Sequence, residues 1–435
     1  MAFAPAATPG SDTLLPRSRA ASGARAADAA PRKLFRDGYA LGVSTVASAG
    51  LGFVAWVLAA RHHTPREMGY ASGLLQAVLL LSAIGLVNLS PALIRFLPVA
   101  GREGRRFIGA TYVVSGTVTA VVAFVFALFR PAHLFEGASF PAFFGFALLA
   151  TLWSIFTLQD AALTGVGAAN WVAGENTVFG VLRVLGIVAL GATGGRWGIV
   201  GSWFIPAVAL IAVINLWPLR TRTLSRAPAV DVSTRVIGRY VTATWLPTVL
   251  QHVVQLVTPL VVLSAIGPTR SSAFSMAWLI FTNIELVGIG FGNALVVHAA
   301  RNRDAVGSLM QAAVRRQLQI LGPVLVGVAV FAHPILSVFG PSYARGGTTT
   351  LRLLALAMLP RIFSLAVTNG ARVAGRLGAV TAIQLPITVG VVGLSALLVP
   401  KYGMIAVGWV AIILHSAIAI ACIPMWRILD GSRQA

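Results

Sequence analysis

Three ionisable side chains lie in the middle of long apolar stretches, where a charge needs a physical reason. Arg183, Glu285 and Arg361 are each flanked by apolar residues, and a charge at the centre of a bilayer costs at least about 2.5–3.5 kcal/mol. An arginine fork binds a pyrophosphate through two hydrogen bonds and keeps its proton. One interpretation is therefore an anion site. A second is a structural ion pair of Glu285 with either arginine, and a third gives Glu285 a coupling proton or sodium ion.

Uncharged polar residues form a stripe in the apolar stretch over 240–266. They recur every three or four positions, on one face of a helix, and are Thr244, Thr248, Gln251, Gln255 and Thr258. His252 lies beside the stripe, Gln76 belongs to an earlier stretch, and Asn176 precedes Arg183 by two helical turns. We interpret these side chains as walls of a hydrated cavity, with hydrogen bonding between packed helices as the alternative. The candidate substrate-binding residues are Gln76, Asn176, Arg183, Thr248, Gln251, His252, Gln255, Glu285 and Arg361.

The elements that must position these residues are twelve long apolar stretches. They span 38–60, 68–90, 107–129, 138–160, 171–191, 197–217, 240–266, 272–298, 317–339, 348–370, 377–399 and 402–426. Each is long enough to cross a hydrocarbon core of roughly 30 Å as a helix. With 57% hydrophobic and 10% charged residues, the chain is predicted to be an all-α polytopic membrane protein. Continuous apolar runs argue against a β-barrel, whose strands alternate.

The positive charges predict the orientation of these helices. Of the 33 lysines and arginines, 23 fall in the terminal tails and the loops on one side, 8 fall on the other side, and Arg183 and Arg361 lie within helices. Because positively charged loops stay in the cytoplasm, both termini are expected there. Positions at membrane edges also explain the net charge of +21 without nucleic acid. The segment 299–316 alternates arginines with apolar residues at helical spacing, which predicts a helix lying flat on the inner leaflet.

The loop over 218–239 divides the predicted spans six and six. We expect a disordered basic tail over 1–37, a six-helix bundle over 38–217, a cytoplasmic linker over 218–239, a second bundle over 240–426 and a short tail over 427–435. Corresponding helices start about 202 to 210 residues apart, as in a parallel repeat. Two such bundles that rock about a central site form an alternating-access transporter. The single cysteine, Cys422, leaves no disulfide within the chain, and no catalytic residue, metal or cofactor is predicted.

Five stretches together resemble the polysaccharide and O-antigen flippases of the multidrug/oligosaccharidyl-lipid/polysaccharide exporter superfamily. They are 68–71 (MGYA), 92–98 (ALIRFLP), 171–185, 335–340 (ILSVFG) and 351–360 (LRLLALAMLP). The resemblance covers nearly everything from residue 38 onward, although each motif is degenerate. It implies a twelve-helix, V-shaped pair of bundles in a bacterial inner membrane. The pair would move an isoprenoid-pyrophosphate-linked glycan from the inner to the outer leaflet for lipopolysaccharide or other cell-surface polysaccharide synthesis. In such relatives the first, second, seventh and eighth helices line the lumen. The drug exporters place an acid in the first helix, which 38–60 lacks.

Two other functions stay open at this point. A cation-coupled multidrug exporter would need an acid facing the lumen, and Glu285 is the one candidate. An integral membrane glycan polymerase or glycosyltransferase would need paired carboxylates, and the sequence pairs none within the apolar stretches. The favoured interpretation is a flippase without enzymatic activity. Its partners would be a lipid-linked glycan, membrane lipids, a proton or sodium ion for coupling, and other membrane proteins of polysaccharide assembly.

Overall fold

The computed structural model describes residues 48–129, 134–135, 140–191, 195–222, 234–301 and 306–430. The predicted tail over 1–37, the start of the first predicted span and half of the predicted linker, 223–233, lie outside these residues. So do the end of the C-terminal tail and the side chain of Gln251. Within the described residues the regular structure is entirely helical, which confirms the predicted all-α class.

The first half of the chain forms one group of helices. An unlabelled helix covers 48–62. It is followed by α2 (Pro65–Gly85), α3 (Leu89–Phe96), α4 (Gly104–Leu128), α5 (Phe140–Gly165), α6 (Ala169–Gly191) and α7 (Gly195–Ile214). A π-helical turn (Asn215–Leu219) and the short α8 (Arg220–Arg222) end this half. We call these elements the N-terminal group.

The second half forms the C-terminal group. It consists of α9 (Thr234–Arg301), α10 (Val306–Val330), α11 (Ala332–Ser337), α12 (Pro341–Val373), α13 (Leu377–Tyr402), α14 (Ile405–Ala421) and α15 (Ile423–Asp430). The helix α9 contains two predicted spans, 240–266 and 272–298, joined at Gly267, whose φ of 75° and ψ of 170° interrupt the helix. Glycine tolerates this positive φ without a Cβ clash.

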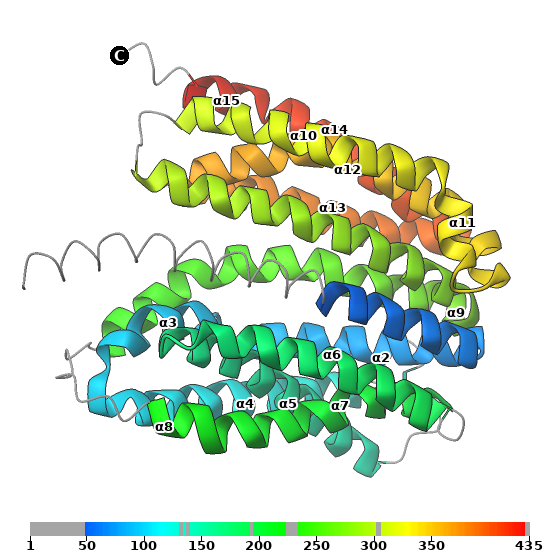
Figure 1. Cartoon of the computed structure of the whole chain (residues 1–435). Helices are drawn as coiled ribbons and strands as arrows, with labels where there is room; N and C mark the ends of the chain where they lie inside the picture. The colour runs from blue at the N-terminus through cyan, green and yellow to red at the C-terminus, as the bar shows by residue number, and fades with distance from the viewer. Residues whose placement is uncertain are drawn as a thin grey trace, which may run out of the picture.

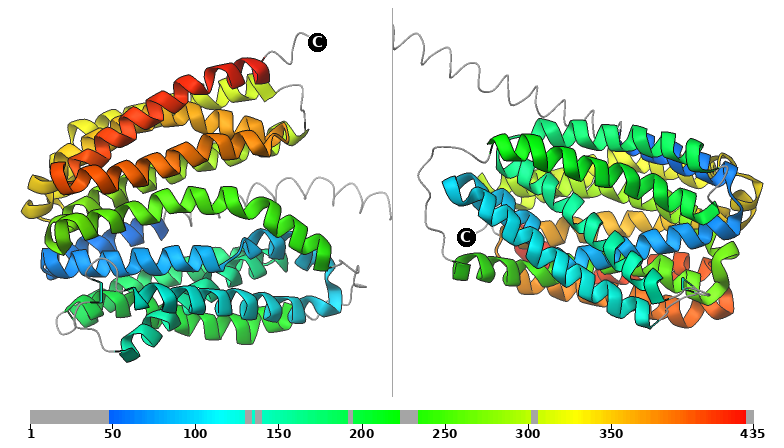
Figure 2. Two further views of the ribbon diagram at one scale, coloured as in Figure 1. Left: turned by 180° about the vertical axis from the view of Figure 1, so that it is seen from behind. Right: turned by 90° about the horizontal axis from the view of Figure 1, so that it is seen from below.

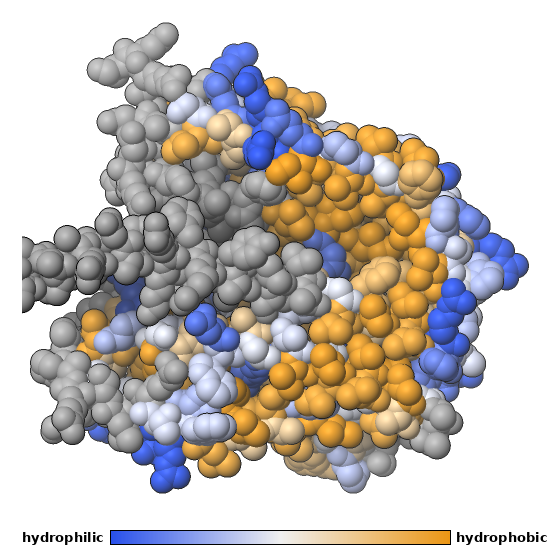
Figure 3. Space-filling model, in the orientation of Figure 1, coloured by the Kyte–Doolittle hydropathy of each residue, from blue (hydrophilic) through white to orange (hydrophobic). Residues whose placement is uncertain are grey.

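The described helices follow the predicted spans in order along the chain. Nine of them are long and apolar enough to cross a membrane, or ten when α14 and α15, which meet at 42°, count as one span. The long α9 counts once in this total. Many apolar side chains are exposed, among them Val113, Phe129 and Leu397, and Figure 3 shows them covering much of one face. The chain is therefore a multi-pass membrane protein.

The predicted surface helix over 299–316 is wrong for the residues that the structure describes there. Residues 306–316 continue directly into the membrane-length helix α10. Their apolar face is covered by protein, because Met310 is fully buried in a cluster with Val367 and Leu429 from α12 and α15. Amphipathic spacing indicates one buried face, and here neighbouring helices cover that face instead of lipid.

Figures 1 and 2 show the two groups close together at the end where α11 and the start of α2 lie. At this end the Arg61 guanidinium donates to the carbonyl oxygens of Val338 and Ser337 at 2.7 and 3.3 Å. The hydroxyls of Ser72 and Ser275 are 3.1 Å apart. A Cβ on Gly69 would lie 1.9 Å from the carbonyl oxygen of Pro268, so only glycine permits this approach of α2 to α9.

Candidate functional site

Three of the predicted site residues meet inside the C-terminal group. The carboxylate of Glu285 accepts hydrogen bonds from the guanidinium of Arg361 and, at 3.1 Å, from the amide of Gln255. Nε2 of His415 lies 3.5 Å from Nη1 of Arg361. The Glu285 side chain is 1% exposed and that of Arg361 is 13% exposed. The two opposite charges therefore neutralise each other away from water, as a structural ion pair would.

The fold brings these residues together by reversing α9 at Gly267. Gln255 lies before the reversal and Glu285 after it, so they face each other across two antiparallel segments. The indole Nε1 of Trp278 donates to the carbonyl oxygen of Gln255 at 2.9 Å and fixes the register. A cavity of about 30 Å³ lies beside Arg361, between α9, α12 and α13. Its volume is close to that of one water molecule.

Arg183 lies in the N-terminal group and pairs with no carboxylate in the part of the chain that the structure describes. Its guanidinium carbon is 4.1 Å from the ring centre of Trp203 and 5.3 Å from that of Trp56. The residue is 6% exposed, and its Nε and Nη2 atoms have no hydrogen-bond partner. Aromatic faces attract a guanidinium through their negative quadrupole. The two tryptophans therefore hold a buried cation of which Nε and Nη2 donate to no partner.

The helix over 48–62 covers this guanidinium. A Cβ on Gly52 would lie 3.8 Å from Nη1 of Arg183. One turn away, a Cβ on Gly180 would meet the side chain of Leu51 at 3.0 Å. The same helix contacts the C-terminal group, since the rings of Phe53 and Phe339 are 5.2 Å apart. Arg183 is thus separated from the boundary between the groups by a single helix.

Two buried acids form a second polar network in the N-terminal group. Glu175 accepts from the amide of Gln159, and Asp160 accepts from Asn176 at 3.2 Å. Asn215 donates to the Gln159 carbonyl at 3.1 Å. One oxygen of each carboxylate is without a partner, and neither acid is within salt-bridge distance of a cation among the described residues. Asn176 therefore belongs to an acidic network and not to the surroundings of Arg183.

The remaining predicted residues are dispersed. His252 is exposed, and its Nδ1 lies 2.8 Å from the carbonyl oxygen of Thr248. Gln76 in α2 is partly buried, and its Oε1 atom has no partner. Gln251 belongs to α9, but its side chain is outside the described part of the chain. Thr258 donates within its own helix to Val254. Within the polar stripe, Gln255 therefore joins the two segments of α9 through its hydrogen bond to Glu285.

Sequence reasoning missed the groups that surround the two arginines. Trp56, Trp203 and His415 are ordinary apolar or weakly polar residues of a membrane helix, and nothing in their spacing marks them. Asp160 and Glu175 were visible as acids, but Gln159 and Asn215 become significant only when α5, α6 and the π-helical turn come together. Contacts between distant helices are not encoded by local periodicity, which reports only the face on which a residue lies.

Comparison with known proteins identifies the architecture. No family model matches the chain, and no curated protein matches it by sequence. A multidrug resistance MATE family transporter of the MOP superfamily in its inward-facing conformation superposes with a TM-score of 0.71 at 18% identity, over 89% of this chain and 95% of that one. The chain has the MATE/MOP fold.

Two further solved structures share the fold. The lipid II flippase MurJ, in an inward closed conformation, superposes with a TM-score of 0.65 at 13% identity, over 90% of this chain and 89% of its own. A MOP superfamily transporter from Pyrococcus furiosus Vc1, described as having a binding pocket of reverse polarity, gives 0.65 at 16% identity over 91% and 95%. The likeness extends along nearly the whole chain in each case.

Proposed function

We propose that this protein is a flippase that moves a polyprenyl-pyrophosphate-linked oligosaccharide across the bacterial cytoplasmic membrane for cell-surface polysaccharide synthesis, O-antigen included. The observation that carries the proposal is Arg183, a buried guanidinium whose Nε and Nη2 atoms have no hydrogen-bond partner and which meets no carboxylate among the described residues. A cation in this state binds a doubly charged pyrophosphate strongly, because little of its charge is neutralised by the protein. The polyprenyl tail would stay in lipid while the sugars pass between the groups.

The fold supports a mechanism of alternating access. Contacts between the groups through Arg61, Ser72 and Gly69 gather at one end. With both termini in the cytoplasm, as the charges predict, that end faces outward, so the molecule is closed on the outside. Rocking of the groups would break these contacts and open the outer side. The two bundles and the linker predicted from the sequence would then be the moving parts.

Movement of the helix over 48–62 would uncover Arg183. At Gly52 the helix has no side chain between its backbone and Nη1 of Arg183, so only backbone covers the guanidinium at this point. The helix also contacts Phe339 of the C-terminal group through Phe53, and a rocking motion would pull on it. Substrate pyrophosphate would then replace the aromatic contacts of Arg183 with hydrogen bonds. The bound pyrophosphate would neutralise the cation and so offset the cost of keeping its charge out of water.

Export in cells tests this proposal. A strain that lacks the protein should stop exporting its glycan while lipid-linked precursor accumulates at the inner face. Arg183→Met should fail to restore export although it reaches the membrane in normal amount, and Arg345→Met, at an exposed position of α12, should restore it. Full export with Arg183→Met would remove the arginine from the mechanism.

A cation-coupled multidrug exporter is the second candidate, favoured by the fold of the MATE transporters. Its sequence-based candidate acid, Glu285, pairs with Arg361, which leaves that carboxylate unsuited to bind a free cation. Asp160 and Glu175 in the N-terminal group would have to serve instead. Drug susceptibility of the deletion strain separates the two functions. Hypersensitivity to several cationic drugs with normal glycan export would establish the exporter and exclude the flippase.

A further inference from the structure

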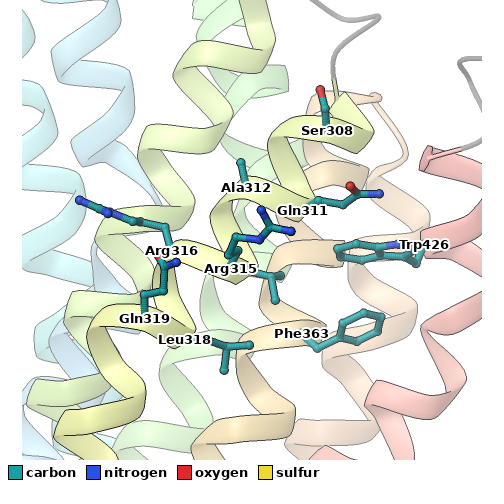
Figure 4. Close-up of a pocket in the computed structure, with 10 residues that line it drawn as sticks. Ser308, Gln311, Ala312, Arg315, Arg316, Leu318, Gln319, Phe363 and Trp426 are labelled. Atoms are coloured by element: carbon teal, nitrogen blue, oxygen red, sulfur yellow. The ribbon is translucent and has the colours of Figure 1, made fainter.

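A pocket of about 960 Å³ lies between α10, α12 and α15, away from both arginine sites described above. In Figure 4, Gln311 and Arg315 on α10 face Trp426 on α15, and Phe363 of α12 lies below them. The side chain of Arg316 points to the other side of α10. The indole of Trp426 stacks on Phe363 with ring centres 4.8 Å apart at 23°. The pocket therefore combines a cationic wall with an aromatic wall.

The arginines of this pocket have no acidic partner among the described side chains, which do not include those of Asp304 and Asp430. Among the described residues, ion pairs join His63 to Glu67, Arg106 to Glu103 and Arg361 to Glu285, and none includes Arg315 or Arg316. Both side chains are exposed. A further guanidinium, that of Arg376, reaches α15, where Nη1 lies 3.8 Å from the Met425 sulfur. The described side chains therefore make the local field positive, which favours an anionic ligand.

The exposed residues of α10 place this pocket at the level of lipid headgroups. Before the arginines, within the described side chains of 307–314, the exposed ones are Gln311 and Ala312. After them, the exposed side chains include Leu318, Val324 and Val330, which suit hydrocarbon. The helix therefore passes from water to lipid near Arg316. A tryptophan at the same level is typical of the interface, because its ring is amphipathic.

We infer that this pocket binds the headgroup of an anionic phospholipid, with its phosphate on Arg315 and an acyl chain along Trp426 and Phe363. The Arg315 guanidinium supplies the donors for phosphate oxygens. The aromatic pair supplies an apolar surface for the first methylenes of the chain. This site is independent of the proposed transport function, since the bound lipid is a resident and not the cargo.

Lipid binding to the purified full-length protein in a neutral detergent tests the inference. Phosphatidylglycerol should raise the melting temperature more than phosphatidylcholine at equal concentration, because it binds the folded state. Arg315→Gln should weaken phosphatidylglycerol binding about fivefold, the effect of one interfacial cation of about 1 kcal/mol. Arg345→Gln, at an exposed arginine of α12 outside the pocket, should leave it unchanged.

Fluorescence quenching locates the lipid. Brominated phosphatidylglycerol should quench the tryptophan fluorescence of the wild-type protein more than that of Trp426→Phe, because Trp426 is the tryptophan that lines the pocket. The other nine of the ten tryptophans remain in the variant and report the background quenching. Equal quenching in both proteins, or equal affinity for phosphatidylglycerol in wild type and Arg315→Gln, would overturn the site. Displacement of the lipid by inorganic pyrophosphate at comparable concentration would overturn the choice of a phospholipid and assign the pocket to a free phosphate ligand.

Discussion

In the C-terminal group the carboxylate of Glu285 meets the guanidinium of Arg361, whereas in the N-terminal group Arg183 lies against Trp56 and Trp203. The acids of the N-terminal group, Asp160 and Glu175, are held by amides instead of cations. Both groups pack helices of similar length and hydropathy, so the fold alone does not require either arrangement. A neutralised pair stabilises packing, while an unneutralised cation remains able to bind an anion. We infer that the buried charges of the C-terminal group stabilise its structure, whereas the buried cation of the N-terminal group binds the substrate.

Breaking the pair in the C-terminal group should have the largest effect on stability. Arg361→Met leaves the buried carboxylate of Glu285 without its cation, which costs about 3–5 kcal/mol. Thermal unfolding in detergent should show a marked loss of melting temperature. The double variant Arg361→Met with Glu285→Gln should recover most of it, because no unpaired charge remains. A double variant no more stable than Arg361→Met would contradict the pairing.

Removing the cation of the N-terminal group should affect transport and spare stability. Arg183→Met removes a buried charge that has no carboxylate partner, so the melting temperature should stay within a few degrees of wild type. Affinity for a polyprenyl-pyrophosphate glycan should fall at least tenfold, about 1.4 kcal/mol, in an equilibrium binding measurement with detergent-solubilised protein. Arg183→Lys keeps the charge without the fork and should bind with intermediate affinity.

The residues changed in these two variants illustrate which features of the site the sequence predicts and which it does not. The sequence identified Arg183, Glu285 and Arg361 as unusual because a charge in an apolar run is visible locally. It offered either arginine as the partner of Glu285, and only the approach of α12 to α9 distinguishes them. The helices themselves follow from hydropathy, since length and apolar content suffice to cross a bilayer.

The prediction of a surface helix over 299–316 was wrong for a related reason. Periodicity over 299–316 reports an apolar face, but Met310 is covered by Val367 and Leu429 from other helices. Two breaks, at Asn88 with its φ of 57° and after Val330, separate short helices from longer ones inside the predicted spans 68–90 and 317–339. Local signals were present there, since asparagine tolerates a positive φ and Pro91 and Pro334 follow closely, but the length of the apolar runs alone does not register them.

A smaller effect should separate the acids of the two groups. Glu175→Gln exchanges a carboxylate that has no cationic partner for an amide of the same shape, and the unfolding free energy should change by less than about 1 kcal/mol. Glu285→Gln leaves the buried guanidinium of Arg361 without its anion and should lower the unfolding free energy several times more. Similar losses in both variants, measured side by side by thermal unfolding, would mean that Glu175 has a charged partner as well.

The smallest effect concerns the aromatic contact of Arg183. A double-mutant cycle with Arg183→Met and Trp203→Phe should give a coupling energy of about 0.5–1 kcal/mol, as expected for a cation–π contact. The cycle removes the packing loss that each single substitution brings. Additive effects would show that Trp203 packs beside the guanidinium without stabilising its charge.

Translocation by purified protein in liposomes tests the central claim most directly. A polyprenyl-pyrophosphate oligosaccharide placed in one leaflet should become accessible to a lectin on the other side when the wild-type protein is present. The Arg361→Met and Glu285→Gln double variant should retain measurable translocation, whereas Arg183→Met should show the rate of empty liposomes. Translocation by Arg183→Met at the wild-type rate, or none by the wild-type protein, would contradict the account.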